Sequence, residues 1–399
     1  MRVALFTREY PPDVYGGAGV HVAYLARELD RRVDLTVHCW GSPRPEGDRP
    51  RVVAHEPWPA LVNDVPADSA LAAISADLVM AQAADAPDIA HSHTWYANLA
   101  GHLTRLIHDV PHVATVHSLE PMRPWKAEQL GGGYAVSTWC ERTALEAAEA
   151  VIAVSSAHRE DIIRALPGVD PDRISVIRNG VDTEEYRPDP GTDVLTRLGV
   201  DPDRPSIVFV GRITHQKGLT HLLDAARHLR PDVQIVLCAG APDTPEIARE
   251  ITAKVDALRA TRDGVVWIAE MASKRDVIQL LSHATVFVCP SVYEPLGIVN
   301  LEAMACGTAV VATAVGGIPE VVADGETGIL VPVRLMEDGS GRPADPARFA
   351  DDLAAAIATL VDDPGLARRM GAAGRRRAED EFSWGAVADQ TLRLYSTLI

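Results

Sequence analysis

Two glutamates separated by seven residues, Glu294 and Glu302, stand in the segment Tyr-Glu-Pro-Leu-Gly-Ile-Val-Asn-Leu-Glu. The segment follows an apolar run, and Glu302 falls about two turns into the helix expected after it. The backbone amides around Leu296, Gly297 and Ile298 open that helix and suit phosphate oxygens. Because carboxylates accept hydrogen bonds from sugar hydroxyls, the pattern predicts that Glu294 holds a transferred hexose and Glu302 a ribose. The alternative is a capped surface helix with ordinary acidic residues.

Two cations, Arg212 and Lys217, follow the apolar run 207–210 at a predicted strand-to-helix turn. A guanidinium and an ammonium at such a turn could neutralise a diphosphate leaving group. Lys217 is one of only four lysines in the chain, which favours this interpretation over a solvated turn with two incidental charges.

The glycines Gly16 and Gly17 follow the opening strand, and we expect a helix to begin near Gly19. Glycine lets a backbone approach a ligand closely, and free amides at a helix start can bind an anion. This predicts a contribution to donor binding. A plain tight turn explains the glycines equally well.

His117 ends the predicted strand 113–117 and could hydrogen-bond a sugar hydroxyl, although a satisfied core histidine is the alternative. His91 and His93 have a spacing that raises the question of a metal. No third imidazole or carboxylate of such a site is evident from the sequence, so we predict a structural or substrate-lining role for this pair and no metal.

Arg123 and Lys126 follow His117 by six and nine residues. Two cations at these places suit an acceptor that carries a phosphate, and we group Thr94 and Tyr96 with them as acceptor-binding residues. The alternative is a surface loop with two solvated charges.

Short β-branched runs alternate with Ala- and Leu-rich helical segments along the whole chain, which predicts parallel sheets covered on both faces. Ten such strands are many for one sheet, so we expect two doubly wound domains. The predicted boundaries are an N-terminal domain at 1–182, a Pro-rich hinge at 183–204, a C-terminal domain at 205–378 and a helix at 379–399 that packs back toward the N-terminal domain. The ten predicted strands are 3–6, 33–38, 89–92, 113–117, 151–154, 207–210, 233–239, 265–268, 286–289 and 309–312.

The chain has 399 residues and a formal net charge of −17, which argues against a nucleic-acid binder and against a basic membrane-docking face. No apolar signal segment or membrane span is evident, and the five cysteines are scattered. We therefore expect reduced cysteines and a cytoplasmic location. A homodimer is compatible with the sequence without being indicated by it.

Together these motifs resemble the retaining glycosyltransferases of the GT-B fold, which include the glycogen synthases. Two stretches, 7–21 and 120–134, are similar to the actinobacterial members that make maltose-1-phosphate. The resemblance implies two Rossmann-like domains facing across a deep cleft, with an acceptor-side N-terminal domain and a nucleotide-sugar-binding C-terminal domain. It also implies ADP-glucose as donor substrate, no cofactor and no metal, with catalytic roles for Glu294, His117, Arg212 and Lys217.

The sequence departs from the bacterial glycogen synthases at three positions. Val14 and Val20 stand where those enzymes have a lysine and an aspartate, and Thr94 replaces the aspartate of their His-x-His-Asp segment. These differences favour a small acceptor, α-glucose-1-phosphate, over a glucan. The remaining alternatives are a glycogen synthase, a sugar-nucleotide 2-epimerase, and a non-catalytic protein that binds nucleotide sugars.

Overall fold

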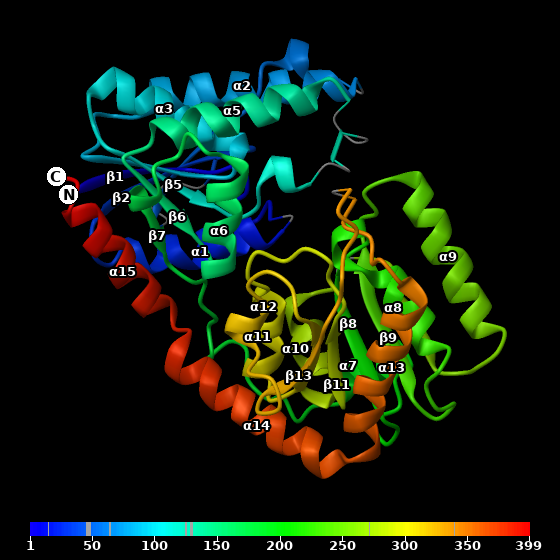
Figure 1. The fold of residues 1–399 in the computed structure, drawn as a ribbon. Helices are drawn as coiled ribbons and strands as arrows, with labels where there is room; N and C mark the ends of the chain where they lie inside the picture. The colour runs from blue at the N-terminus through cyan, green and yellow to red at the C-terminus, as the bar shows by residue number, and fades with distance from the viewer. Residues whose placement is uncertain are drawn as a thin grey trace. The chain divides into compact units, whose positions relative to one another are not determined.

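The computed structural model describes residues 1–14, 16–44, 49–63, 65–123, 126–127, 131–270, 272–338 and 340–399. The chain divides into two compact units, which are considered one at a time below (Figure 1). The first unit consists of Met1–Gly180 together with Trp384–Ile399, and the second of Val181–Ser383. The segment predicted as a hinge belongs to the second unit and contains helix α7 (Asp193–Leu198). Its function as a hinge stays a prediction.

The first unit is built on a parallel sheet in the order β3-β2-β1-β4-β5-β6-β7. Most residues of its central strands are buried because helices cover both faces, as a doubly wound sheet requires. The strands are β1 (Arg2–Phe6), β2 (Asp34–Trp40), β3 (Arg51–His55), β4 (Ile89–His93), β5 (His112–Val116), β6 (Ala150–Ala153) and β7 (Ile174–Val176).

The helices α2, α3 and α5 pack against one another and cover one face of this sheet (Figure 1). The helices α1 and α15 form a second packed pair. Trp384, the first residue of α15, stacks on Tyr24 of α1 with ring centroids 5.5 Å apart, and Arg32 pairs with Asp389 at 3.0 Å. The C-terminal helix is therefore part of the first unit. The helices are α1 (Gly17–Leu29), α2 (Pro66–Ala83), α3 (Trp95–His108), α5 (Gly133–Ala147), α6 (Ser156–Ala165) and α15 (Trp384–Ser396).

The second unit has a parallel sheet in the order β10-β9-β8-β11-β12-β13. Its strands are β8 (Ser206–Arg212), β9 (Gln234–Gly240), β10 (Val265–Ile268), β11 (Val286–Cys289), β12 (Ala309–Thr313) and β13 (Gly328–Val331). Besides α7, its helices are α8 (Leu219–Ala226), α9 (Pro245–Arg259), α10 (Lys274–His283), α11 (Ile298–Ala305), α12 (Ile318–Val321), α13 (Pro346–Asp362) and α14 (Pro364–Glu381).

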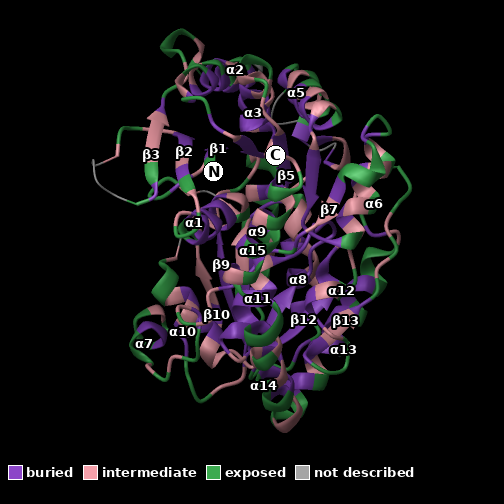
Figure 2. Ribbon diagram, turned by 90° about the vertical axis from the view of Figure 1, so that its left-hand side faces the viewer, coloured by how far each residue is buried: buried purple, intermediate pink, exposed green. Residues whose placement is uncertain are grey.

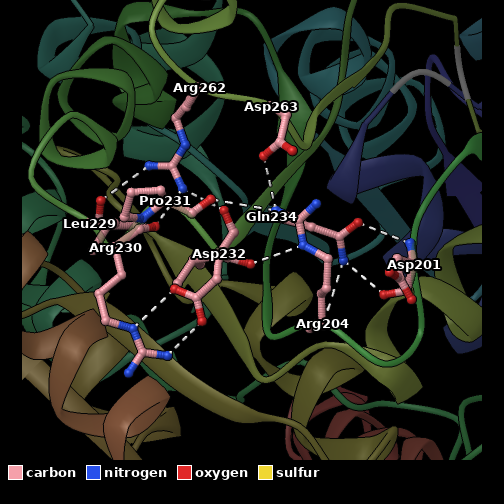
Figure 3. Close-up of polar contacts among 10 residues, drawn as sticks. Asp201, Arg204, Leu229, Arg230, Pro231, Asp232, Gln234, Arg262 and Asp263 are labelled. Atoms are coloured by element: carbon pink, nitrogen blue, oxygen red, sulfur yellow. Dashed lines mark hydrogen bonds and ion pairs between the residues drawn. The ribbon is translucent and has the colours of Figure 1, made fainter.

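A polar network anchors the amino-terminal ends of β8 and β9 (Figure 3). The side chain of Gln234 is buried, and it accepts a hydrogen bond from the Asp201 amide at 2.9 Å and donates one to the Asp201 carbonyl at 2.8 Å. Arg262 donates to the carbonyls of Arg230 at 2.7 Å and Val233 at 2.5 Å. The Gln234 contacts tie the segment before β8 to the start of β9, and Arg262 gives the Arg230 carbonyl a second donor. This network lies at the amino-terminal ends of the strands, whereas doubly wound sheets bind ligands at the carboxyl ends.

The observed architecture confirms the expectation of two doubly wound α/β domains, with buried strands and partly exposed helices (Figure 2). All ten predicted strands coincide with or overlap observed ones, and β3, β7 and β13 were not predicted. The five cysteines are buried and free, as expected. Among the described residues, none of the helices has the length and apolar character needed to cross a membrane.

Candidate active site

The ammonium of Lys217 and the carboxylate of Glu294 form an ion pair in the second unit. Lys217 ends the short 3-10 helix His215–Lys217 that follows β8, and Thr214 caps this turn by accepting from the Lys217 amide. The Lys217 Nζ donates to Glu294 Oε2 at 2.6 Å, and the Ser291 hydroxyl donates to the same oxygen at 3.2 Å. Burial alone would lower the pKa of Lys217, but the Glu294 carboxylate outweighs it and the pKa is raised. Lys217 is therefore fully charged at neutral pH.

Glycines allow the loop that carries Glu294 to lie against its neighbours. A Cβ on Gly316, whose φ is +52°, would lie 2.0 Å from the Glu294 carbonyl oxygen, and the Gly317 amide donates to that oxygen at 3.0 Å. A Cβ on Gly218, whose φ is +64°, would lie 2.0 Å from the Pro290 carbonyl oxygen. Neither glycine was assigned a role from the sequence, because the close approach is made by residues distant in the chain.

The helix α11 begins at Ile298 after Gly297, which has φ +98°. Leu296 is buried beside this turn. Next to it lies Asn300, which is fully buried and whose side-chain oxygen and nitrogen have no hydrogen-bond partner among the described residues. A small pocket opens here, and its polar lining consists of Lys217, Ser291, Glu294 and Asn300. Of the predicted donor-binding residues, Lys217, Glu294 and Gly297 line this pocket.

Glu302 lies within α11 and is buried. Burial raises its pKa to about 7, and a hydrogen bond from Tyr186 and the charge of Lys274 oppose this shift. The carboxylate therefore titrates near neutral pH. Tyr186 lies in the segment predicted as a hinge, and sequence reasoning did not assign it to the site.

Arg212 is the last residue of β8, and its Nη1 donates to Asp243 Oδ1 at 3.0 Å. Its charge is close enough to Lys217 to oppose protonation of that lysine. The two predicted diphosphate-binding cations therefore act on a common region at the carboxyl end of β8. Asp243 was missed because it lies 31 residues away in the chain.

In the first unit, His117 follows the end of β5, and its Nε2 lies 3.0 Å from Nδ1 of His93 on β4. The Nε2 of His93 is buried and has no partner among the described residues. If His93 were protonated at Nε2, it would bury an N–H without an acceptor, which costs more free energy than burying an unprotonated nitrogen. His93 therefore donates from Nδ1, and His117 accepts at Nε2. The proton of neutral His117 then lies on Nδ1, which has no hydrogen-bond partner among the described residues and can donate to a ligand. Burial is the main cause that lowers the pKa of His117, with His21, His158 and His91 adding to it.

A third imidazole, that of His21 on α1, accompanies this pair. Its ring centroid lies 4.6 Å from that of His117 and 5.4 Å from that of His93. The expectation that no third imidazole would be found here is wrong, because His21 is distant in sequence and reaches the pair only when α1 packs on the sheet. His91 instead hydrogen-bonds Thr115 and Tyr395, which is a structural role.

The predicted acceptor residues lie in the first unit, and two of them are more buried than a solvated loop would be. Arg123 and Lys126 are 8% and 9% exposed. Arg123 donates to the Ser118 hydroxyl at 3.1 Å and lies 3.8 Å from the buried carboxylate of Glu120. The alternative of a surface loop with two solvated charges is therefore wrong for these two side chains.

Aromatic rings and a further cation accompany them. The Lys126 Nζ lies 6.0 Å from the centroid of the Tyr96 ring, and the guanidinium of Arg8 lies 4.2 Å from it. Thr94 precedes α3 with φ +64°. Arg8 lies in the stretch 7–21, and the sequence assigned it no function. Of the two stretches that carry the family resemblance, Tyr15, Pro124–Trp125 and 128–130 lie outside the described residues.

At the start of α1, the Gly16 amide donates to the carboxylate of Glu9 at 2.7 Å. A Cβ on Gly19 would lie 2.7 Å from the same carboxylate. The helix begins at Gly17, two residues before Gly19 and so near the predicted start, and this carboxylate accepts from the amide of its N-cap residue Gly16. Gly16 and Gly17 are therefore positioned beside an anionic group of the protein itself.

Two family profiles match the chain. The family described as Glycosyltransferase Family 4 matches residues 15–185, and that described as Glycosyl transferases group 1 matches residues 195–377. Together with the two parallel α/β units, these matches define the class of protein: it is a glycosyltransferase of the GT-B fold.

The relatives narrow this class. An α-maltose-1-phosphate synthase of Mycolicibacterium smegmatis is 58% identical over 398 residues, which cover 99% of each chain. A glycogen synthase of Mycobacterium tuberculosis is 30% identical and covers 99% of this chain and 94% of its own. Among solved structures, a sucrose-phosphate synthase from Thermosynechococcus elongatus has a TM-score of 0.80 at 25% identity, covering 100% of this chain and 98% of its own. The chain belongs to the glycosyltransferase family that contains the α-maltose-1-phosphate synthases.

Proposed function

We propose that the protein transfers glucose from ADP-glucose to α-glucose-1-phosphate, retains the anomeric configuration and produces α-maltose-1-phosphate. The observation that carries the proposal is the 58% identity, over 99% of both chains, to an enzyme named for that product. The buried cations Arg123 and Lys126 support it, since a phosphorylated acceptor offers them an anion and a glucan does not.

In this proposal the bond between the glucose C1 and the diphosphate breaks as C1 bonds to O4 of the acceptor. The proton of that hydroxyl passes to an oxygen of the leaving phosphate. Arg212 and Lys217 stabilise the negative charge that develops on the diphosphate. Glu294 holds the hexose, Glu302 the ribose, and the Nδ1 proton of His117 is available to the transferred sugar.

We further propose that these cations and the helix start at Gly297 make a metal unnecessary for transfer, and that the reaction takes place in the cytoplasm. The buried, unpaired cysteines favour a reducing compartment. Activity unchanged after dialysis against EDTA is the expected result. Activity lost on dialysis and restored by a divalent ion would contradict the metal-free proposal.

The test of the reaction is a screen of ADP-glucose and UDP-glucose against α-glucose-1-phosphate, maltose and glycogen, with the product identified by mass and by its anomeric NMR signals. We expect a disaccharide phosphate with an α linkage, and ADP as the second product. Glycogen synthase is the second candidate, favoured by the 30% identical relative of that name. A much faster reaction with glycogen than with glucose-1-phosphate would replace the first candidate by the second.

A further inference from the structure

We propose that His21, His93 and His117 form a binding site for one transition-metal ion of the zinc class. One ligand nitrogen from each ring can be chosen so that the three atoms lie within 4.8 Å of one another. The rings come from three different elements, α1, β4 and the residue after β5, and all belong to the first unit. Among the described residues, the group consists of these three histidines, without an Asp or Glu.

Two of the three rings present buried lone pairs that nothing else uses. The His21 Nδ1 lies 2.8 Å from the Asn179 Oδ1, and because an amide oxygen only accepts, His21 donates there and its Nε2 is unprotonated. His93 donates from Nδ1 to His117, which leaves its own Nε2 unprotonated as well. Both Nε2 atoms are buried and lack a partner among the described residues. A ring that donates its other N–H to an amide oxygen while its free nitrogen faces inward has the arrangement of a metal-ligating histidine.

The charge state of the rings also suits a metal, because imidazole ligates only when neutral. Burial is the main cause that lowers the pKa of each of the three, that of His21 to about 4. No proton has to be expelled from these rings at neutral pH.

The distances are close to those of a metal centre without matching it. Metal–nitrogen bonds of 2.0–2.1 Å in a tetrahedral site place the ligand nitrogens about 3.4 Å apart. One nitrogen from each of the three rings lies within 4.8 Å of the other two. Binding therefore draws these nitrogens closer together and takes the Nε2 lone pair of His117 from its hydrogen bond with His93. Three imidazoles select zinc, cobalt, nickel or copper over magnesium or calcium, which prefer oxygen ligands.

Access to the site is through His117, which is half-buried, whereas His21 and His93 are fully enclosed. The fourth position of a tetrahedral ion would face the same side. On the proposed function, a metal here engages His117 and withdraws it from the transferred sugar, so the ion inhibits transfer. The binding itself does not depend on that function.

The test uses the full chain, freed of metal by EDTA dialysis, and titrates it with Co²⁺ while the visible absorption is recorded. We expect one Co²⁺ per chain, with the intense d–d bands of a tetrahedral site, and displacement by one equivalent of Zn²⁺. His21→Gln should weaken Co²⁺ binding by at least about 100-fold, and Asn179→Ala by about 10-fold through loss of the orienting hydrogen bond.

The matched control is His55→Gln. His55 and His38 are also buried and have facing nitrogens 3.1 Å apart, but no third His, Cys, Asp or Glu among the described residues completes a metal site with them. This variant should leave Co²⁺ affinity unchanged. Equal losses in His55→Gln and His21→Gln would overturn the proposal, because surface histidines or general destabilisation would then explain the binding.

The wild-type titration decides the matter even if His21→Gln does not fold. Absence of stoichiometric binding, or only the weak bands of octahedral cobalt, would overturn the site. The turnover arm is separate: Zn²⁺ should inhibit the wild-type enzyme at about one equivalent, with recovery on adding EDTA. If the acceptor screen fails while the tetrahedral spectrum is present, the proposed function is wrong and the metal site stands.

Discussion

The Nζ of Lys217 lies 2.6 Å from Oε2 of Glu294, so the residue proposed to bind the donor diphosphate is paired with the residue proposed to bind the donor hexose. Each neutralises the other at the pocket beside α11. A nucleotide sugar supplies both with new partners, phosphate oxygens for the ammonium and hydroxyls for the carboxylate. The pair is therefore preorganised for a ligand that is anionic at one end and rich in hydroxyls at the other.

Replacing Lys217 or Arg212 by Ala should lower kcat by about 100- to 1000-fold, because each change removes one charge-assisted contact to the departing phosphate. Steady-state kinetics at saturating donor measures this effect. Lys254→Ala is the control, since Lys254 also pairs with a carboxylate, Asp224, at 2.5 Å on the same unit. Near-normal turnover in a folded Lys217→Ala variant would refute the diphosphate assignment.

Glu294→Gln should leave the affinity for ADP roughly intact while crippling transfer, whereas Glu302→Ala should chiefly weaken ADP binding. The reason is that Glu294 is assigned to the hexose, which ADP lacks, and Glu302 to the ribose, which ADP retains. Calorimetry with ADP alone, together with kcat for each variant, checks both statements. The reverse pattern would exchange the two roles.

The contribution of Glu302 to the free energy of unfolding should fall as pH rises from about 4.5 to about 7. Burial raises the pKa of Glu302 to about 7. In that window the folded chain holds a proton at Glu302 that the unfolded chain has released, so this contribution declines with pH, while the buried histidines with lowered pKa values contribute with the opposite sign. The full effect of such a shift is about 3 kcal/mol. Urea unfolding of wild type and of Glu302→Gln, compared at each pH, isolates it: the difference between them should grow across the window and be flat above it.

ADP binding should release protons near pH 7, because ribose hydroxyls donate to the charged form of Glu302 and lower its pKa in the complex. ADP affinity should accordingly increase as pH rises through 7. Calorimetry in two buffers of different ionisation enthalpy measures the released proton. Glu302→Gln should show a smaller release, and an unchanged value in that variant would assign the proton to another group.

Changing Arg123 and Lys126 together to Ala should raise KM for glucose-1-phosphate by about 10- to 100-fold, the loss expected when charged hydrogen bonds to a phosphate are removed. Activity with maltose, which carries no phosphate, should change much less. Arg105→Ala is the control, since Arg105 pairs with Glu149 at 2.7 Å and has no assigned role. If the double variant retains its preference for the phosphorylated acceptor, other residues recognise the phosphate.

Sequence patterns predicted the central strands better than the edges of the sheets. The three unpredicted strands, β3, β7 and β13, each lie at an edge. A central strand in a parallel sheet is apolar on both faces and is recognisable from a short run of residues. An edge strand such as β3, Arg-Val-Val-Ala-His, is only partly buried, so its pattern is weaker and the pairing with β2 decides its structure.

The sequence by itself determined the fold class and the chemistry available at the ends of its strands. Alternating apolar runs require parallel sheets, and Arg212, Lys217, Glu294 and Glu302 were identified by type and spacing. Only the tertiary structure decided which partners those groups meet: Asp243 for Arg212, Tyr186 for Glu302 and His21 for the pair His93 and His117. Spacing along the chain records the periodicity of a helix or strand, whereas contacts between distant residues depend on how those elements pack, and packing is encoded in no single segment.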